Sequence, residues 1–264
     1  MEGQRIERLV QNRANLRFPF PDGFAERLTG ARIDHMGRRA KFLTLTLSTG
    51  EMLVMHLGMT GRFTVGGSQL GEFHHETGTD ARHDHVVFHL GSGATVTYND
   101  PRRFGFMELW PAETFQAYPR LMRMGPEPLS NAFSAAYLDE VLQGRKAPIK
   151  AALLDQSIIA GLGNIYVCEA LWRSGISPKR RASTVPGQRA ARLAPAINEV
   201  ITEAIEAGGS SISDFASTNG ELGYFQHSFA VYAREGQACR NCGGPIKRLV
   251  QSGRSSFFCS TCQR

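Results

Sequence analysis

The sequence predicts an α+β protein with several domains: an antiparallel β-sandwich, then a helical domain, then a small hairpin held by cysteines. In the first half of the 264-residue chain, apolar and polar residues alternate with the two-residue period of strands. After Pro126 the apolar residues recur with helical spacing, and four cysteines lie near the end. We expect three domains, formed by residues 1–118, 119–228 and 229–264.

The β-sandwich prediction comes from two hairpins. The first joins residues 42–47 to residues 52–57, and the second joins residues 85–90 to residues 95–98. Strands this short must pack face to face, as antiparallel sheets, to bury their apolar sides. The polar, glycine-rich segment 66–81 between the hairpins is expected to be a loop.

The helical prediction rests on two segments. Apolar residues recur at helical spacing through residues 192–207, up to the breaker Gly208-Gly209. Glycines interrupt the helical pattern of residues 160–178, so two helices joined by glycine turns are expected there. Asn164 is expected to be the N-cap of the second helix, where backbone N–H groups can bind a phosphate; a plain structural cap is the alternative.

Two CxxC pairs separated by 16 residues predict a structural zinc site. Four thiolates in two close pairs can surround a tetrahedral Zn²⁺ and leave no position open for catalysis. Two disulfides or a rubredoxin-like iron site are the alternatives, but the first residues show no secretory signal, so we expect a reducing cytoplasm. Cys168 lies in an apolar run and is expected to be a buried thiol. The predicted zinc ligands are Cys239, Cys242, Cys259 and Cys262.

Composition and charge limit the partners. A hydrophobic fraction of 42% is typical of a globular protein, and no apolar run suggests a membrane span. The net charge of +6 and the pI of about 9.3 favour a polyanion as partner. Charge alone fits a plain basic surface as well, so the positions of the basic residues must decide.

Eight segments in a fixed order resemble the formamidopyrimidine-DNA glycosylase family, which is related to endonuclease VIII. They cover nearly the whole chain, and although each is weak alone, the ordered set is specific. The four-cysteine hairpin is one of them, and the other seven are RRAKFL (38–43), HLGMTG (56–61), DPRRFG (100–105), MGPEPL (124–129), IKAALLDQ (149–156), GLGNIYVCEAL (161–171) and GGSSISDF (208–215).

The resemblance implies a β-sandwich, a helix-two-turn-helix domain and a zinc finger with one structural Zn²⁺, in a monomer that binds damaged duplex DNA. The implied activity is DNA repair: excision of oxidised purines such as 8-oxoguanine and formamidopyrimidines by base flipping, then strand cleavage at the abasic site. An amine attacks C1′ of the flipped nucleotide, and a protonated imine permits the eliminations. Lys41 matches the lysine that assists elimination, and Arg254 matches the arginine that clamps phosphates beside the lesion.

Other positions match residues that hold the DNA. Met59, Arg102 and Phe104 match the wedge that fills the void left by the flipped base, although core packing is the alternative for Met59 and Phe104. Residues 208–229 match the loop that folds over that base. A plain solvated charge is the alternative for one of the implied phosphate contacts, Arg145. The full set of implied phosphate contacts is His83, Arg145, Lys150 and Asn164.

The chain departs from the family at its N-terminus. Family members begin with Pro-Glu-Leu-Pro-Glu, whose proline amine is the nucleophile, whereas this chain opens MEGQRIERLV, which resembles the segment after the family's first helix. Three explanations are open: a start assigned too far downstream, so that this chain is an inactive piece of an active glycosylase; a lesion- or abasic-site-binding protein without glycosylase activity; or a zinc-finger regulator or structural zinc protein. The motifs favour oxidised purines over oxidised pyrimidines, and we expect a cytoplasmic, nucleoid-associated bacterial protein.

Overall fold

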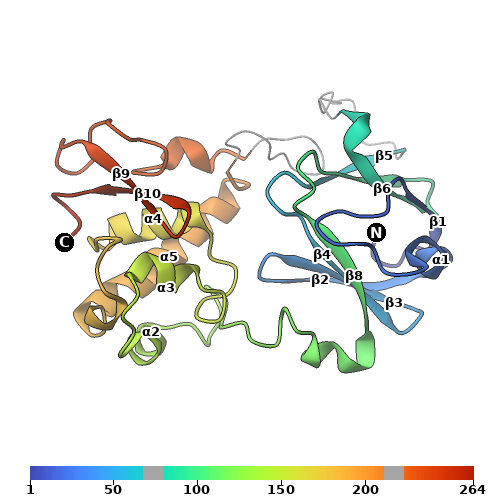
Figure 1. Ribbon diagram of the computed structural model, residues 1–264, viewed down its shortest axis with the longest axis horizontal. Coiled ribbons are helices and arrows are strands. Elements are labelled where there is room, and N and C mark those ends of the chain that lie inside the picture. Colours follow the sequence, from blue (N-terminus) through green and yellow to red (C-terminus); the bar gives the residue numbers. More distant parts are fainter. Residues whose placement is uncertain (68–79, 211–222) are drawn as a thin grey trace. The chain divides into compact units, whose positions relative to one another are not determined.

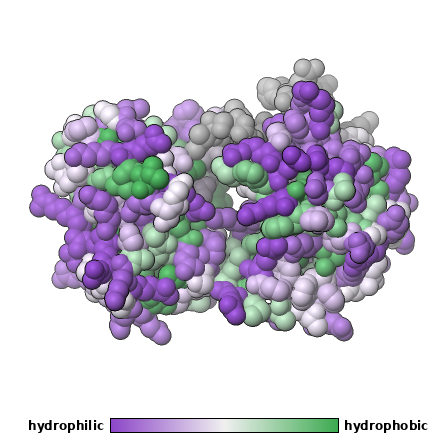
Figure 2. All heavy atoms as spheres, viewed as in Figure 1, coloured by the Kyte–Doolittle hydropathy of each residue, from purple (hydrophilic) through white to green (hydrophobic). Residues whose placement is uncertain are grey.

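Figure 1 shows the computed structural model of the protein, which divides into two compact units, each with its own buried core. The structure describes residues 1–67, 80–210 and 223–264. Of the described residues, the N-terminal unit holds 1–122 and Gly223, and the C-terminal unit holds 123–210 and 224–264. Hydrophilic side chains cover most of the face of each unit that Figure 2 presents.

The N-terminal unit is a sandwich of two four-stranded antiparallel sheets, which confirms the predicted architecture (Figure 1). One sheet has the strand order β1-β6-β7-β5 and the other β2-β3-β4-β8. The strands are β1 Ile6–Gln11, β2 Ile33–Arg39, β3 Phe42–Leu47, β4 Glu51–His56, β5 Arg62–Gly66, β6 Asp84–Leu90, β7 Thr95–Asn99 and β8 Phe106–Pro111. The two predicted hairpins are β3-β4 and β6-β7. Of the expected loop 66–81, residues 68–79 lie outside the described residues.

Because apolar residues alternate along the strands, one face of each sheet is apolar, and these two faces pack against each other. Val86 and Phe88 from one sheet, and Leu45 and Leu53 from the other, are fully buried in one continuous core. Burial of each such side chain contributes roughly 1.5–3 kcal/mol, which offsets the entropy cost of ordering the strands. A short helix, α1 (Phe24–Leu28), adds two apolar side chains to this core, and the 3-10 helix η2 (Ala112–Ala117) follows β8.

The C-terminal unit is helical apart from one hairpin. Its helices are α2 Ala135–Leu142, α3 Ile149–Leu154, α4 Asn164–Arg173, η3 Ala182–Thr184, α5 Gln188–Glu206 and η4 Phe225–Ser228. The pattern predicted for residues 192–207 lies in α5, which packs against α2 and α4. Within residues 160–178 the structure has one helix, α4, and not the predicted pair. The preceding helix, α3, ends at Leu154, and residues 155–163 between the two contain turns and no helix. None of the helices in the described part of the chain is long and apolar enough to cross a membrane.

The start of α4 differs from the prediction by one residue. Gly163, in extended conformation, is the N-cap, and Asn164 is the first helical residue. The Asn164 side chain therefore does not cap the helix. It donates from Nδ2 to the carbonyl oxygen of Ser255 at 3.0 Å. The local pattern could not show this, because the competing acceptor lies 91 residues further along the chain.

The C-terminal hairpin consists of β9 (Ile246–Gln251) and β10 (Arg254–Cys259), paired antiparallel. Ser252 and Gly253 at its tip both have positive φ angles (49° and 73°), as a two-residue hairpin turn of type I′ requires. A small core that includes Cys168 of α4 packs under the hairpin. Cys168 is a buried thiol, as predicted, and burial raises its pKa.

Candidate functional site

The buried carboxylate of Asp100 joins two loops of the N-terminal unit, one after β4 and one after β7. It accepts hydrogen bonds from the Thr60 hydroxyl (2.5 Å), the Tyr98 hydroxyl (3.1 Å) and the Gly105 N–H (2.9 Å). Burial raises the pKa of Tyr98, so its hydroxyl remains a donor. A buried carboxylate is costly unless donors surround it, and these three bonds supply the donors. The bond from Thr60 joins the two loops, and the other two lie within the segment that contains Asp100.

The two loops approach each other too closely for a side chain at two of their glycines. A Cβ atom on Gly58, where φ is 71°, would lie 2.5 Å from the backbone carbonyl carbon of Phe104. A Cβ atom on Gly105 would lie 1.8 Å from the Tyr98 hydroxyl. These glycines of the HLGMTG and DPRRFG motifs are therefore required by loop packing.

Three side chains reach the surface from this support. Met59 is 70% exposed and Phe104 is 42% exposed, so neither is a core residue. The Arg102 guanidinium carbon lies 4.6 Å from the centre of the Phe104 ring, within cation–π distance. The Arg102 N–H donates to the Thr60 hydroxyl oxygen at 3.3 Å. The structure thus brings together the three residues expected to form the wedge, on loops that the hydrogen bond between Thr60 and Asp100 joins.

Lys41 is exposed at the turn between β2 and β3, close to the half-buried His56 at the end of β4. The His56 ring stacks on Phe106 with ring centres 5.6 Å apart. Burial lowers the pKa of His56, and the charges of Lys41, Arg17 and Arg120 lower it further. Because the lowered pKa keeps the imidazole neutral, the positive charge of this region is carried by Lys41, Arg17 and Arg120.

His83 ends the 3-10 helix η1 (Ala81–His83) and is partly exposed. Its carbonyl oxygen accepts the N–H of Asp100 at 3.0 Å, and its ring centre lies 6.4 Å from that of His85. The buried His85 donates from Nε2 to the Asp100 carbonyl oxygen at 2.8 Å, and burial lowers the pKa of His85. His83 is therefore linked by a backbone hydrogen bond to Asp100, whose side chain also holds the loops of the wedge.

In the C-terminal unit, Lys150 has no exposed surface. Its Nζ donates to the Ser255 carbonyl oxygen (2.8 Å) and to the Ser256 hydroxyl oxygen (2.7 Å). Asn164 donates to the same Ser255 carbonyl, while its buried Oδ1 has no hydrogen-bond partner among the described residues. Burial lowers the pKa of Lys150, and the nearby Arg254 charge lowers it further. Two helices thus anchor the strand that begins with Arg254.

The other two expected cations are exposed. Arg254 begins β10 beside the hairpin tip, in register with Gln251. Arg145 follows α2 and donates from Nε to the Val141 carbonyl oxygen at 2.6 Å. That bond satisfies a carbonyl at the end of α2 and leaves the terminal nitrogens of Arg145 toward solvent.

The four cysteines of the hairpin form a metal centre. Their Sγ atoms all lie within 4.8 Å of one another, with 3.9 Å between Cys239 and Cys262 and 3.4 Å between Cys242 and Cys259. A tetrahedral Zn²⁺ with Zn–S bonds of about 2.3 Å needs sulfurs about 3.8 Å apart, so the cluster fits one structural zinc. The indole N–H of Trp172 points at Cys239 Sγ (3.5 Å), an outer contact of the kind that orients zinc ligands.

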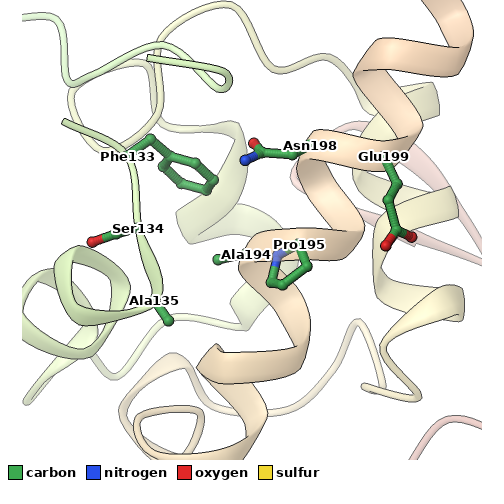
Figure 3. Close-up of a pocket in the computed structure, with 7 residues that line it drawn as sticks. All are labelled: Phe133, Ser134, Ala135, Ala194, Pro195, Asn198 and Glu199. Atoms are coloured by element: carbon green, nitrogen blue, oxygen red, sulfur yellow. The ribbon is translucent and has the colours of Figure 1, made fainter. Parts of the chain in front are cut away.

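A pocket of ≈ 390 Å³ lies between the start of α2 and the middle of α5 (Figure 3). Its walls are mainly apolar, and Asn198 and Glu199 are its polar members besides Ser134. None of the residues expected from the sequence to act on DNA lines this pocket. The exposed candidate residues therefore lie outside this pocket, on loops within the N-terminal unit and, separately, after α2 and at the hairpin tip within the C-terminal unit.

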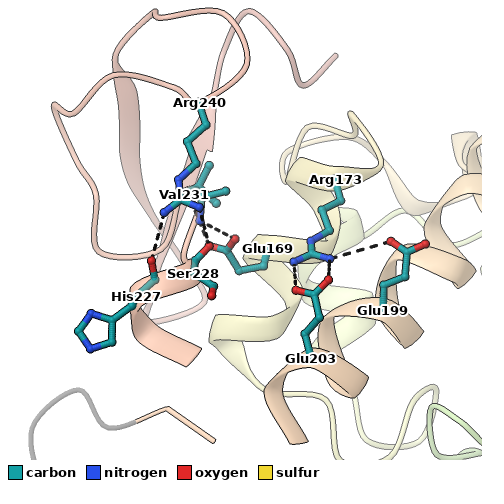
Figure 4. Close-up of polar contacts among 9 residues, drawn as sticks. Glu169, Arg173, Glu199, Glu203, His227, Ser228, Val231 and Arg240 are labelled. Carbon is teal, nitrogen blue, oxygen red and sulfur yellow. Dashed lines mark hydrogen bonds and ion pairs between the residues drawn. The ribbon is translucent and has the colours of Figure 1, made fainter. Parts of the chain in front are cut away.

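Sequence reasoning missed the carboxylates and the arginine that hold these parts in place. Asp100 is one, and Glu169, buried in α4, is another: it accepts the N–H groups of residues 230–232 at 2.8 to 3.0 Å. Arg240, between two zinc ligands, donates to the carbonyl oxygens of residues 227 and 228 (Figure 4). An acidic residue inside an apolar run, as in NIYVCEAL, is the signal that could have found Glu169.

Models of three domains match the chain in succession. Residues 1–107 match the formamidopyrimidine-DNA glycosylase N-terminal domain, residues 124–216 match the formamidopyrimidine-DNA glycosylase H2TH domain, and residues 236–264 match the zinc finger found in FPG and IleRS. These domains define a zinc-finger protein of the helix-two-turn-helix class.

Similar proteins and solved structures show which family within this class the chain matches. The chain is 56% identical over 266 residues to the formamidopyrimidine-DNA glycosylase of Ruegeria pomeroyi, covering 100% of this chain and 94% of that protein. It is 57% identical over 275 residues to the enzyme of that name from Rhodopseudomonas palustris, with the same coverage. The MutM (Fpg) crystal structure from Thermus thermophilus superposes with a TM-score of 0.85 at 39% identity, covering 100% of this chain and 92% of that one. The complex between Lactococcus lactis Fpg and DNA containing an abasic site gives a TM-score of 0.87 at 30% identity, covering 100% and 94%. The chain belongs to the formamidopyrimidine-DNA glycosylase family.

Proposed function

We propose that the protein is a DNA repair enzyme that excises oxidised purines, including 8-oxoguanine and formamidopyrimidines, from duplex DNA and then cleaves the strand as an abasic-site lyase. Identity of 53–57% over the full chain to relatives named formamidopyrimidine-DNA glycosylase carries this proposal. Lactococcus lactis relatives are solved with DNA that contains Fapy-dG or an abasic site. We propose a monomer that acts on damaged duplex DNA in the bacterial cytoplasm, at the nucleoid, with domains formed by residues 1–118, 119–228 and 229–264.

The proposed wedge consists of Met59, Arg102 and Phe104. Base flipping leaves a void in the duplex, and an apolar side chain can replace the lost stacking while a guanidinium bonds the orphaned base. Exposure of the two apolar side chains supports this role, because a wedge must reach the DNA and a side chain buried in the core could not. The Asp100 hydrogen bonds support it further, since a wedge must be held rigidly.

Lys41 and Arg254 are the proposed catalytic residues. Attack of an amine on C1′ expels the base, and the protonated imine that results acidifies C2′–H, so that the 3′ phosphate can leave. An exposed ammonium at Lys41 could donate a proton or stabilise charge in these steps. Arg254, on a hairpin stiffened by the zinc and anchored by Lys150 and Asn164, presents a guanidinium to phosphate from a fixed place.

The proposed phosphate contacts fall into two groups. His83 and Arg145 are accessible, which suits direct contact with phosphate. Lys150 is fully buried, so a direct contact would require its ammonium to leave Ser255 and Ser256. The geometry favours an indirect role for Lys150 and Asn164, in which they position the tip that carries Arg254.

Two measurements test this function. The first compares binding of the 264-residue chain to a duplex with an 8-oxoguanine, to one with a stable abasic-site analogue and to an undamaged duplex. Tighter binding to both damaged duplexes is expected, and Met59→Ala together with Phe104→Ala should abolish the preference. Equal affinity for all three duplexes would contradict the proposal.

The second measurement tests the chemistry. Residues 1–264 contain no match to the family's N-terminal proline, so the assay uses a chain preceded by the family's Pro-Glu segment. Borohydride should trap a covalent complex with the 8-oxoguanine duplex, and Lys41→Ala should slow strand cleavage by about 100-fold, as loss of a general acid does. Lesion binding without trapping or cleavage would instead support a lesion-binding protein that lacks glycosylase activity.

A further inference from the structure

Positive charge is concentrated in the C-terminal unit. Residues 123–210 and 224–264 contain 16 Lys and Arg against nine Asp and Glu, an excess of seven. Residues 1–122 contain 14 Lys and Arg against 13 Asp and Glu, an excess of one. The proposed function uses Arg145, Lys150 and Arg254 of the C-terminal unit, which leaves most of its basic residues without a role.

Two segments of this unit run side by side and bring basic residues together. The N–H of Ile149 donates to the Arg180 carbonyl oxygen (2.6 Å), and the N–H of Ser183 donates to the Arg145 carbonyl oxygen (3.0 Å). Arg181 pairs with Pro148 as an isolated antiparallel bridge. Residues 145–149 lead directly into α3, so this pair of segments lies next to the start of the helix that carries Lys150.

The adjoining turn and the start of α5 add further cations. Arg189 donates to the Thr184 carbonyl oxygen (3.2 Å), and Arg192 donates to the Ser174 carbonyl oxygen (3.4 Å). Lys179 lies 5.6 Å from the centre of the Phe258 ring. The basic turn surface is defined here as Lys146, Lys179, Arg181, Arg189 and Arg192.

Among the described residues, no carboxylate forms an ion pair with the basic turn surface. No ion pair joins its five members to an acidic side chain in the part of the chain that the structure describes. The nearby Asp139 accepts the Gly187 N–H at 2.8 Å, and Glu140 lies close to Tyr137, as does Arg145. The first turn of α5 contains Arg189 but no acidic residue, although the helix dipole favours anions there. These charges therefore oppose helix stability, and a polyanion would compensate them.

We propose that the basic turn surface is a second contact with duplex DNA, which binds the phosphate backbone of the lesion-containing duplex beyond the contacts of the lesion site. Charge complementarity supports this partner, because duplex DNA carries one negative charge per about 1.7 Å of its axis. The position of the surface supports this partner as well, since the surface adjoins Arg145, a proposed phosphate contact, and the start of α3. The inference rests on the proposed function, and it adds residues that contact DNA irrespective of sequence and lesion.

The test measures how affinity depends on salt for the 264-residue chain. Lesion duplexes of about 12 and about 30 base pairs are compared, because the longer one offers phosphates further from the lesion. The variant Lys146→Gln/Arg181→Gln neutralises two exposed side chains for which no side-chain hydrogen bond is seen in the described structure. With the long duplex its slope of log affinity against log salt should be shallower by about 1.8, since each lost contact removes about 0.9. With the short duplex the slope should match that of the parent.

Arg5→Gln/Arg8→Gln, in and beside β1 of the N-terminal unit, is the matched control, because it removes the same charge. An unchanged slope on the long duplex for both variants would overturn the inference, and so would an equal decrease for both. If the parent distinguishes lesion from undamaged DNA while the variant keeps the parent's slope, only the inference fails. If the parent does not distinguish them, the proposed function fails. Capture of two duplexes by one protein, with equal slopes on both lengths, would show a separate DNA site and also overturn it.

Discussion

Lys150 Nζ donates a 2.8 Å hydrogen bond to the carbonyl oxygen of Ser255, a residue 105 positions further along the chain. The bond joins the start of α3 to the strand that carries Arg254, and Ser256 receives a second bond from the same ammonium. A buried ammonium is tolerated only where acceptors surround it, so this lysine is a structural link between the helical part and the zinc hairpin.

Lys150→Met removes that link while keeping an unbranched side chain of similar length. The Ser255 carbonyl keeps only its bond from Asn164, so we expect the free energy of unfolding to fall by about 1–3 kcal/mol. Amide hydrogen exchange at residues 254–256 should accelerate, whereas the zinc content should not change. Lys247→Met, on the exposed side of β9, is the control and should change the stability by less than about 0.5 kcal/mol. Unchanged exchange at the tip in Lys150→Met would show that the two bonds do not fix it.

Asp100→Asn tests the support beneath the wedge. The asparagine side chain keeps one acceptor oxygen, but its NH₂ group replaces the other. That NH₂ group then lies opposite a group that donates in the parent, which is Thr60, Tyr98 or Gly105. We expect a loss of about 2–4 kcal/mol in the free energy of unfolding, measured with urea, because a buried donor is left facing another donor. Asp34→Asn removes a carboxylate from an exposed ion pair with Arg32 and should cost less than about 1 kcal/mol. Similar losses in both variants would contradict the role given to Asp100.

Met59→Ala separates a surface wedge from a core residue. Met59 is 70% exposed, so its truncation should change the free energy of unfolding by less than about 0.5 kcal/mol. Met55→Ala is the matched control, because Met55 is only 4% exposed and should cost about 2–5 kcal/mol. Affinity for lesion duplex should fall in Met59→Ala at a protein concentration where both variants are folded. A destabilisation of Met59→Ala equal to that of Met55→Ala would place Met59 in the core.

The sequence predicted the features that depend on local patterns. The hairpins β3-β4 and β6-β7 follow from alternation, α5 follows from helical spacing, and the zinc centre follows from two CxxC pairs. Features that depend on distant partners could not be predicted in this way. The sequence favours exposure for a lysine near a helix start, yet Lys150 is buried because its acceptors come from the hairpin. Asn164 is displaced from its expected cap for the same reason.

The wedge residues show the same difference between what local patterns predict and what depends on distant partners. The motifs identified Met59, Arg102 and Phe104 through a family resemblance, but residue types alone left core packing open for the two apolar residues. The loops that carry them are joined by a hydrogen bond between Asp100 and Thr60, which lie 40 residues apart. Both residues lie within the quoted motifs, but the local sequence could not show that they bond to each other, because the bond exists only after the strands have packed.

His56 provides a test of the electrostatics beside Lys41. Its Nδ1 accepts the Gly58 N–H at 3.0 Å, which requires the neutral ring, and burial lowers its pKa, as do the charges of Lys41, Arg17 and Arg120. The folded protein therefore binds a proton at His56 less readily than the unfolded chain does. Stability from this residue is fully present above the unfolded pKa of about 6.5 and is lost as the pH falls from there through the lower folded pKa.

We expect the His56 ring resonances to titrate below about pH 6.5 in NMR spectra of the folded protein. Lys41→Ala should raise that pKa, because it removes one of the cations, whereas Arg5→Ala, which is not among the charges that act on His56, should leave it unchanged. His56→Phe should reduce the loss of thermal stability between pH 7 and pH 5, since the unfolded chain then gains one proton fewer than in the parent. A pKa insensitive to Lys41→Ala would show that Lys41 does not act on this ring, and titration of His56 above pH 6.5 would contradict the lowering of its pKa by burial.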